Sequence, residues 1–165
     1  MTVSITSGTE TLRATHESRP DGGWARFLGS HQSSELGALV LRVALGLVFI
    51  AHSVWLKLVV YTLPGTAEFF ASIGLPYSLA YLVFAAEVAG GLALIVGFHA
   101  RLVAAALLPI ALGAWWAHLG AGWLFTNPGG GWEYPALLAV ALVVQFLLGD
   151  GALAWRRSVA RRSFG

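Results

Sequence analysis

The sequence predicts an all-α integral membrane protein: a four-helix bundle with both termini in the cytoplasm and a short interfacial helix between the first two spans. The chain of 165 residues is 57% hydrophobic and only 11% charged, whereas soluble domains carry about a quarter charged residues. Its mean hydropathy is +0.72. Four apolar stretches approach the roughly 20 residues that a membrane-spanning helix needs.

These apolar stretches predict four membrane-spanning helices. They cover residues 36–61, 76–97, 102–125 and 132–148. Hydrocarbon offers the backbone no hydrogen-bonding partner, so stretches that cross it are expected to be helical. The chain then divides into a polar cytoplasmic tail (1–35), a membrane domain (36–149) and a basic cytoplasmic tail (150–165).

The distribution of Lys and Arg predicts the orientation, because cytoplasmic segments of membrane proteins are enriched in these residues. Lys57 is the only basic residue expected near the outer side. The remaining basic residues outside the spans fall in the two tails and in the loop between the second and third stretches: Arg13, Arg19, Arg26, Arg101, Arg156, Arg157, Arg161 and Arg162.

The longest connection, between the first two stretches, is expected to contain the short interfacial helix. Phe69, Phe70 and Ile73 share one side at helical spacing. Gly74 is suited to end such a helix, and Pro76 is suited to begin the next one.

Ionisable side chains inside a membrane are costly and need a partner or a function. Arg42 and Glu87 fall in the first and second stretches at depths that differ by less than roughly 10 Å at the helical rise. We therefore expect a buried ion pair between Arg42 and Glu87, with Arg101 nearby. The pair is interpreted either as a structural link between two helices or as a proton or ligand site.

A second group of polar residues predicts an outward-facing polar pocket near Glu68. Its candidate ligand-binding residues are His52, Lys57, His118 and Glu133. A quinone head group held by His, Trp and an acid is one interpretation. A b-type haem between the two histidines fits less well, because their estimated depths differ. Polar residues that simply satisfy one another are the third interpretation.

Composition excludes several classes of chemistry. The chain contains no cysteine, so disulfides, thiolate-held iron–sulfur clusters and covalently attached haem are excluded. No metal site is predicted. The net charge is only +2, and the basic residues lie where a membrane protein places them, so no nucleic-acid partner is expected.

Several segments together resemble the DoxX family over residues 39–155. They are LRVALGLVFIAH (41–52) followed by Lys57, FFASIGLP (69–76), EVAGGLALIVGF (87–98) followed by Arg101, then His118, Glu133-Tyr134 and LGDGA (148–152). The family usually has Gly after the histidine of its first helix, where this chain has Ser53. The resemblance implies a four-helix protein of the bacterial inner membrane. Some relatives look like subunits of quinone-linked redox systems, including thiosulfate:quinone oxidoreductase, and others are tied to oxidative-stress complexes.

The sequence favours the first of three functions, with the second as the main alternative. The first is an accessory subunit that anchors a redox complex and is not catalytic alone; its partners are the lipid bilayer and other membrane or membrane-associated subunits. The second is a quinone-binding subunit of an oxidoreductase that itself takes part in electron transfer. The third is a small transporter, which the charged groups within the membrane would suit.

Overall fold

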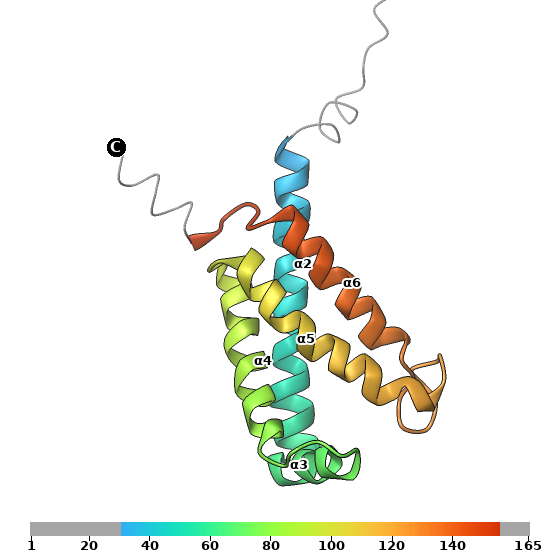
Figure 1. Cartoon of the computed structure of the whole chain (residues 1–165). Coiled ribbons are helices and arrows are strands. Elements are labelled where there is room, and N and C mark those ends of the chain that lie inside the picture. The colour runs from blue at the N-terminus through green and yellow to red at the C-terminus, as the bar shows by residue number, and fades with distance from the viewer. Residues whose placement is uncertain (1–30, 156–165) are drawn as a thin grey trace, which may run out of the picture.

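The computed structural model describes residues 31–155, and in this part of the chain all of the regular secondary structure is helical (Figure 1). The two predicted tails, 1–35 and 150–165, lie largely outside these residues. The α-helices are α2 (His31–Ile50), α3 (Leu63–Ser72), α4 (Leu79–Val96), α5 (Ala100–His118) and α6 (Glu133–Leu148). A π-helix, η1 (Ala51–Val60), continues α2 directly, and a 3₁₀ turn, η2 (Leu119–Ala121), continues α5.

Within residues 31–155, three helical segments are long and apolar enough to cross a membrane, namely His31–Val60, Leu79–Val96 and Ala100–Ala121. The fourth helix, α6, is apolar but has only 16 residues, which rise about 24 Å against a hydrocarbon core of about 30 Å. The structure thus gives three clear spans where the sequence predicts four.

Polar and apolar side chains are distributed as in a membrane protein. Large apolar residues such as Val40, Leu137 and Leu147 are more than 60% exposed. Among the few buried polar residues are Arg42 and Glu87, at 1% and 5% exposure. An apolar exterior around buried charges is suited to a lipid environment and would be unfavourable in water. Together with the three spans, it identifies a multi-pass membrane protein.

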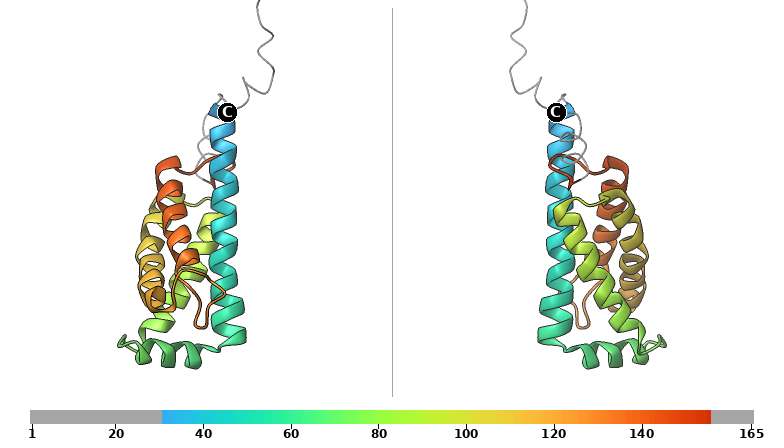
Figure 2. Two further views of the ribbon diagram at one scale, coloured as in Figure 1. Left: turned by 90° about the vertical axis from the view of Figure 1, so that its right-hand side faces the viewer. Right: turned by 90° about the vertical axis from the view of Figure 1, so that its left-hand side faces the viewer.

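The helices form two pairs, α2 with α4 and α5 with α6 (Figures 1 and 2). The first pair crosses where Gly46 meets Gly91, and a Cβ atom built on Gly46 would lie only 2.7 Å from the carbonyl oxygen of Gly91. Small residues allow this close approach of two backbones. The core between the pairs contains Leu45, Phe49, Leu94, Leu107 and Leu142, with alanines of α5 and α6.

The pairs separate toward the end where α3 lies across the bundle (Figures 1 and 2). This is the short helix expected between the first two stretches. Thr62 precedes it and its Oγ1 accepts a hydrogen bond from the Gly65 N–H at 3.3 Å, a typical N-cap interaction. Gly74, with φ of 83°, follows the helix.

Candidate functional site

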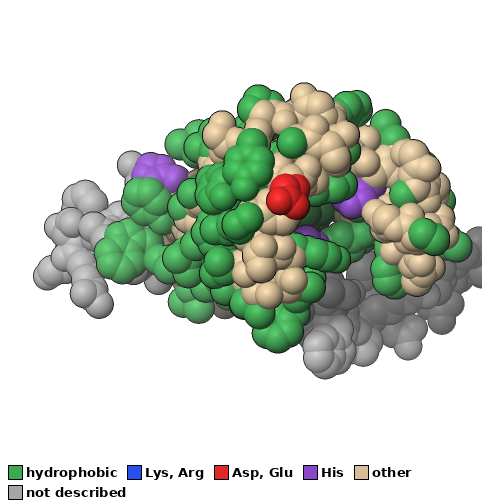
Figure 3. Space-filling model, turned by 90° about the horizontal axis from the view of Figure 1, so that it is seen from below, with side chains coloured by type: hydrophobic (Ala, Val, Ile, Leu, Met, Phe, Trp, Pro, Cys, Tyr) green, Lys and Arg blue, Asp and Glu red, His purple; other side chains and the backbone are tan. Residues whose placement is uncertain are grey.

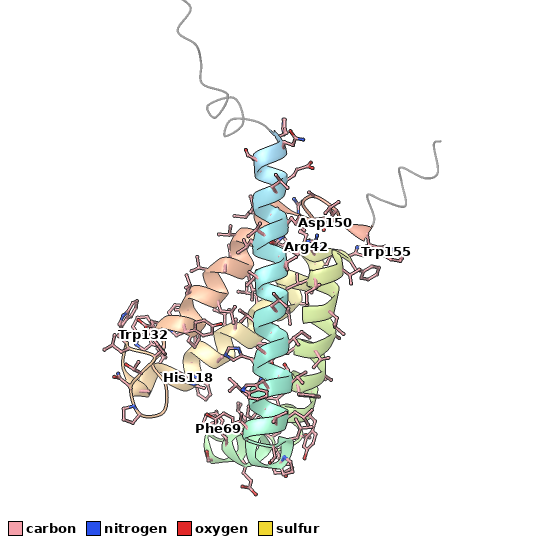
Figure 4. All side chains as sticks on the ribbon, turned by 180° about the vertical axis from the view of Figure 1, so that it is seen from behind. Arg42, Phe69, His118, Trp132, Asp150 and Trp155 are labelled. Atoms are coloured by element: carbon pink, nitrogen blue, oxygen red, sulfur yellow. The ribbon has the colours of Figure 1, made fainter. Side chains whose placement is uncertain are left out.

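The polar side chains of the bundle form three groups at different levels along α2 and η1. Arg42 lies at the level where the chain returns through Asp150, as Figure 4 shows from behind. Ser53, Lys57 and Glu87 form a second group. His118 lies toward the end that carries α3, where Figure 4 also places Trp132. His52 lies in η1, the segment that precedes α3.

Arg42 caps the carboxyl end of α4. Its Nη1 donates to the carbonyl oxygens of Leu94 and Ile95 at 2.9 and 3.1 Å, and its Nη2 donates to the carbonyl of Ala152 at 3.1 Å. The last carbonyls of a helix have no partner within the helix and carry the negative end of its dipole. A guanidinium offers several donors in a fixed fork, so one buried side chain serves two segments.

The turn after α4 leaves room for this arginine. Phe98 N–H donates to Ala93 and Gly97 N–H donates to Leu94, which is a Schellman motif with Gly97 in the left-handed region at φ of 78°. A Cβ atom on Gly97 would overlap the guanidinium of Arg42. Glycine is therefore required here both for the backbone conformation and for space.

Arg101 lies near the same end but plays a lesser part. Its backbone N–H donates to Oδ1 of Asp150 at 3.3 Å, and its exposed guanidinium donates to the carbonyl of Leu147 at 3.4 Å. A cavity of about 540 Å³ opens beside it, lined also by His31, Glu35 and His99. Asp150 thus caps the start of α5, at a helix end that favours negative charge.

The second group is a buried ion pair between η1 and α4. The ammonium of Lys57 lies 2.6 Å from Oε2 of Glu87, and the Ser53 hydroxyl donates to the same oxygen at 2.7 Å. The side chains of Lys57 and Glu87 are 18% and 6% exposed. The pairing thereby neutralises a carboxylate that is buried near the middle of α4.

This pairing corrects the expected ion pair between Arg42 and Glu87. Because α2 begins at His31, it projects beyond the end of α4, and Arg42 lies level with the last turn of α4. Glu87 instead lies level with Ser53, eleven residues further along, which is roughly 16 Å at the helical rise. The expected depth match assumed that the two helices begin and end at the same level, and they do not.

The two histidines meet the same short segment of chain. The His52 ring stacks on Tyr134, with ring centroids 5.4 Å apart and planes 12° apart. His118 lies beside Gly130, since a Cβ built there would be 3.4 Å from the imidazole. Trp115, one turn before His118, stacks on Trp132 at 6.0 Å. The segment from 130 to 134 is therefore contacted by side chains of both η1 and α5.

Comparison with known proteins places the chain in a family. Residues 37–120, about half of the chain, match the family model named DoxX. The chain belongs to the DoxX family. A protein of Bacillus subtilis (strain 168) named "Putative oxidoreductase CatD" is 38% identical over 73 residues, which make up 44% of this chain and 52% of that protein. The chain thus spans about half the length of this relative. No solved structure matches the chain significantly.

The DoxX match runs from α2 through η2 and contains six of the seven candidate residues, all but Glu133. The structure does not bring those residues into one pocket. Lys57 pairs with Glu87, whereas Glu133 accepts a hydrogen bond from the Phe125 N–H at 3.1 Å and fastens the α5–α6 loop. Glu68 is exposed on α3. Of the four expected ligand-binding residues, His52 and His118 contact the segment from 130 to 134, and Glu133 belongs to that segment.

Sequence reasoning overlooked several residues of this DoxX protein. Gln145 is fully buried in α6; its Nε2 donates to the Gly149 carbonyl at 2.7 Å, and its Oε1 accepts no hydrogen bond from the residues that the structure describes. Asp150 and Tyr134 stand out in the sequence only as parts of the DoxX pattern. Gln145 could have been predicted to form a buried hydrogen bond, because it is a single polar residue in an apolar helix and such residues normally bond to neighbouring segments.

Proposed function

We propose that this DoxX-family protein is an accessory subunit that anchors a quinone-linked redox complex in the bacterial cytoplasmic membrane. The observation that carries the proposal is that the buried charged side chains bond to other parts of the bundle. Arg42 bonds to carbonyls of two segments, and Lys57 and Glu87 bond to each other. These groups hold helices together, as expected of a scaffold. We expect no turnover by this chain alone.

Two further observations support a redox complex. The relative in Bacillus subtilis carries the word oxidoreductase in its name. The bundle also exposes broad apolar faces, for example Leu102, Leu112 and Trp116 along α5. A small bundle with such faces and with small residues on them is suited to pack against other membrane subunits.

The proposal includes a membrane topology. We infer that α6 is a fourth span and that both termini lie in the cytoplasm, because Arg residues are abundant at both ends of the chain and Lys57 is the only basic residue on the other side. The segment after α6 then lies on the same side as the start of α2, where the Ala152 N–H donates to the Glu35 carbonyl at 3.0 Å.

Purification from native membranes tests the proposal. The full chain with a C-terminal affinity tag would be extracted with a mild detergent and its companions identified and quantified by mass spectrometry. We expect an oxidoreductase subunit in stoichiometric amount. A tagged, unrelated four-helix membrane protein at matched abundance is the control. Recovery of the chain without any stoichiometric partner, at several detergent strengths, would contradict the accessory role.

A further inference from the structure

The end of the bundle that carries α3 presents two histidines from different elements around one segment. His52 comes from η1 and stacks on Tyr134, and His118 ends α5 beside Gly130. The other two histidines of the described residues, His31 and His99, line the cavity at the opposite end. Figure 3 shows the face seen from below as hollowed, with histidine side chains at the rim of the hollow and inside it.

Hydrogen bonds fix which nitrogen of each ring carries the proton. Nδ1 of His52 lies 3.1 Å from the carbonyl oxygen of Val48, and Nδ1 of His118 lies 2.7 Å from that of Ala114. A carbonyl oxygen can only accept, so each Nδ1 must donate. In the neutral imidazole the other nitrogen, Nε2, then has a free lone pair and acts as an acceptor. Both histidines are half-buried.

A third polar atom of this region is left without a protein partner. Nε1 of Trp115 is buried and makes no hydrogen bond within the described residues. Buried donors normally bond to protein or to ordered water, so this N–H is left with a partner to be supplied. Trp115 also stacks on Trp132, which meets Trp123 edge-to-face with centroids 4.5 Å apart. Aromatic rings therefore lie on the same segment, 130 to 134, that both histidines contact, and aromatic side chains beside a few polar atoms are typical of sites for flat organic molecules.

We propose that this end of the bundle binds a planar aromatic ligand that donates hydroxyl protons, a hydroquinone or a simpler phenol, with Nε2 of His52 and Nε2 of His118 as the acceptors. The acceptors select a hydroxylated ring over the corresponding quinone, because quinone oxygens can only accept and leave both Nε2 atoms unsatisfied. This proposal deepens the accessory function, and it rests on that function only for the redox role of the ligand.

Binding to the purified full chain in lipid nanodiscs tests the selectivity. Durohydroquinone and duroquinone share one tetramethyl ring and differ in the two hydroxyl protons, and 2,3,5,6-tetramethylphenol retains one of them. Tryptophan fluorescence under anaerobic conditions reports binding. We expect durohydroquinone to bind at least about fivefold more tightly than duroquinone, the factor that one buried hydrogen bond supplies. Phenol binding equal to that of the hydroquinone would indicate a general phenol site. Equal affinity for the hydroquinone and the quinone would overturn the proposal.

Variants test the two acceptors. An asparagine amide can still donate to the carbonyl that Nδ1 now serves, but it places no acceptor at the position of Nε2. His52→Asn and His118→Asn should each weaken durohydroquinone binding at least about fivefold and leave duroquinone binding within twofold. His99→Asn, at the opposite end, is the matched control and should change neither. Equal weakening by the control would overturn the assignment.

A measurement on the unaltered protein covers the case in which a variant fails to fold. In protein with ¹⁵N-labelled imidazoles, the Nε2 resonances of two of the five histidines should move when durohydroquinone is added and not when duroquinone is added. Resonances that stay still with both ligands would refute the site. Neither result depends on partner recovery, so failure here is distinguishable from failure of the accessory function.

Discussion

Lys57 and Ser53 both donate to one oxygen of Glu87, at 2.6 and 2.7 Å. This three-residue contact joins the π-helix η1 to the middle of α4. A charge withdrawn from water is costly to leave alone, and breaking a buried pair by removing one partner is more harmful than the pair itself is stabilising. The contact is therefore an obligatory link between the first two spans, and it yields the first prediction.

Replacement of Glu87 by Gln should destabilise the fold. Lys57 loses its counter-charge while remaining only 18% exposed. We therefore expect the free energy of unfolding to fall by about 3 kcal/mol, the lower end of the cost of breaking a buried pair, because Lys57 keeps some contact with its surroundings outside the bundle. Reversible unfolding in mixed micelles, followed by circular dichroism, measures the change. In a double-mutant cycle, Lys57→Met should cost much less in the Glu87→Gln background than in the wild type.

Glu68→Gln is the matched control for this change, because Glu68 is an exposed carboxylate on α3. It should alter stability by less than about 0.5 kcal/mol. If Glu87→Gln is as stable as the wild type but loses its redox partner, the pair serves function and not folding.

Arg42 should resist replacement even by another cation. Lysine carries one compact ammonium and cannot match the planar fork that reaches two carbonyls of α4 and one of Ala152. Arg42→Lys should cost about 2 kcal/mol and should speed hydrogen exchange at the amides of Gly97 and Phe98, which close the last turn of α4. Arg101→Lys is the control, since that guanidinium is exposed and makes one long bond. Unchanged exchange in Arg42→Lys would show that the cap is dispensable.

The glycines of α2 and α5 should differ sharply in their tolerance of a methyl group. A Cβ on Gly46 would lie 2.6 Å from Cγ1 of Ile95 and 2.7 Å from a backbone oxygen, whereas nothing lies within 4 Å of a Cβ on Gly113. Gly46→Ala should therefore cost about 1–3 kcal/mol through overpacking. Gly113→Ala should be neutral or stabilise the helix by up to about 1 kcal/mol. Thermal unfolding of both variants in one detergent gives the comparison; similar midpoints would mean that the helices of the first pair do not cross at Gly46.

The helical class of the fold and most of its helices were readable from the sequence, because the length of an apolar stretch is a local property. The short helix α3 was readable too, from its apolar side and from Gly74. The π-helix η1 was not, since its residues carry no pattern that separates it from an α-helix. The third predicted stretch, 102–125, extends too far: the helix α5 passes into η2, which ends at Ala121, and Gly122 follows with φ of 80°.

The partners of the polar residues were not readable, because they depend on how far each helix projects past its neighbour. The sequence does predict which polar residues lie at membrane depth, and Arg42, Lys57 and Glu87 all form hydrogen bonds or ion pairs within the bundle. Their relative depth follows from the start of α2 at His31, in a segment too polar to be counted as part of a span. The stacking of His52 on Tyr134 likewise depends on the return of the chain through the α5–α6 loop.

The short length of α6 makes its proposed crossing of the membrane the part of the topology that most needs an experimental test. Its 16 residues rise about 24 Å, so a span by α6 requires a locally thinned bilayer or help from flanking residues.

The chain contains no cysteine, so single cysteines can be labelled without background. We expect Thr126→Cys, in the exposed α5–α6 loop, to react with an impermeant maleimide on intact cells. Ser158→Cys should react only after the membrane is permeabilised, as should the control Ser34→Cys at the start of α2. Labelling of positions 126 and 158 from the same side would show that α6 does not cross, and the protein would then have three spans with its ends on opposite sides.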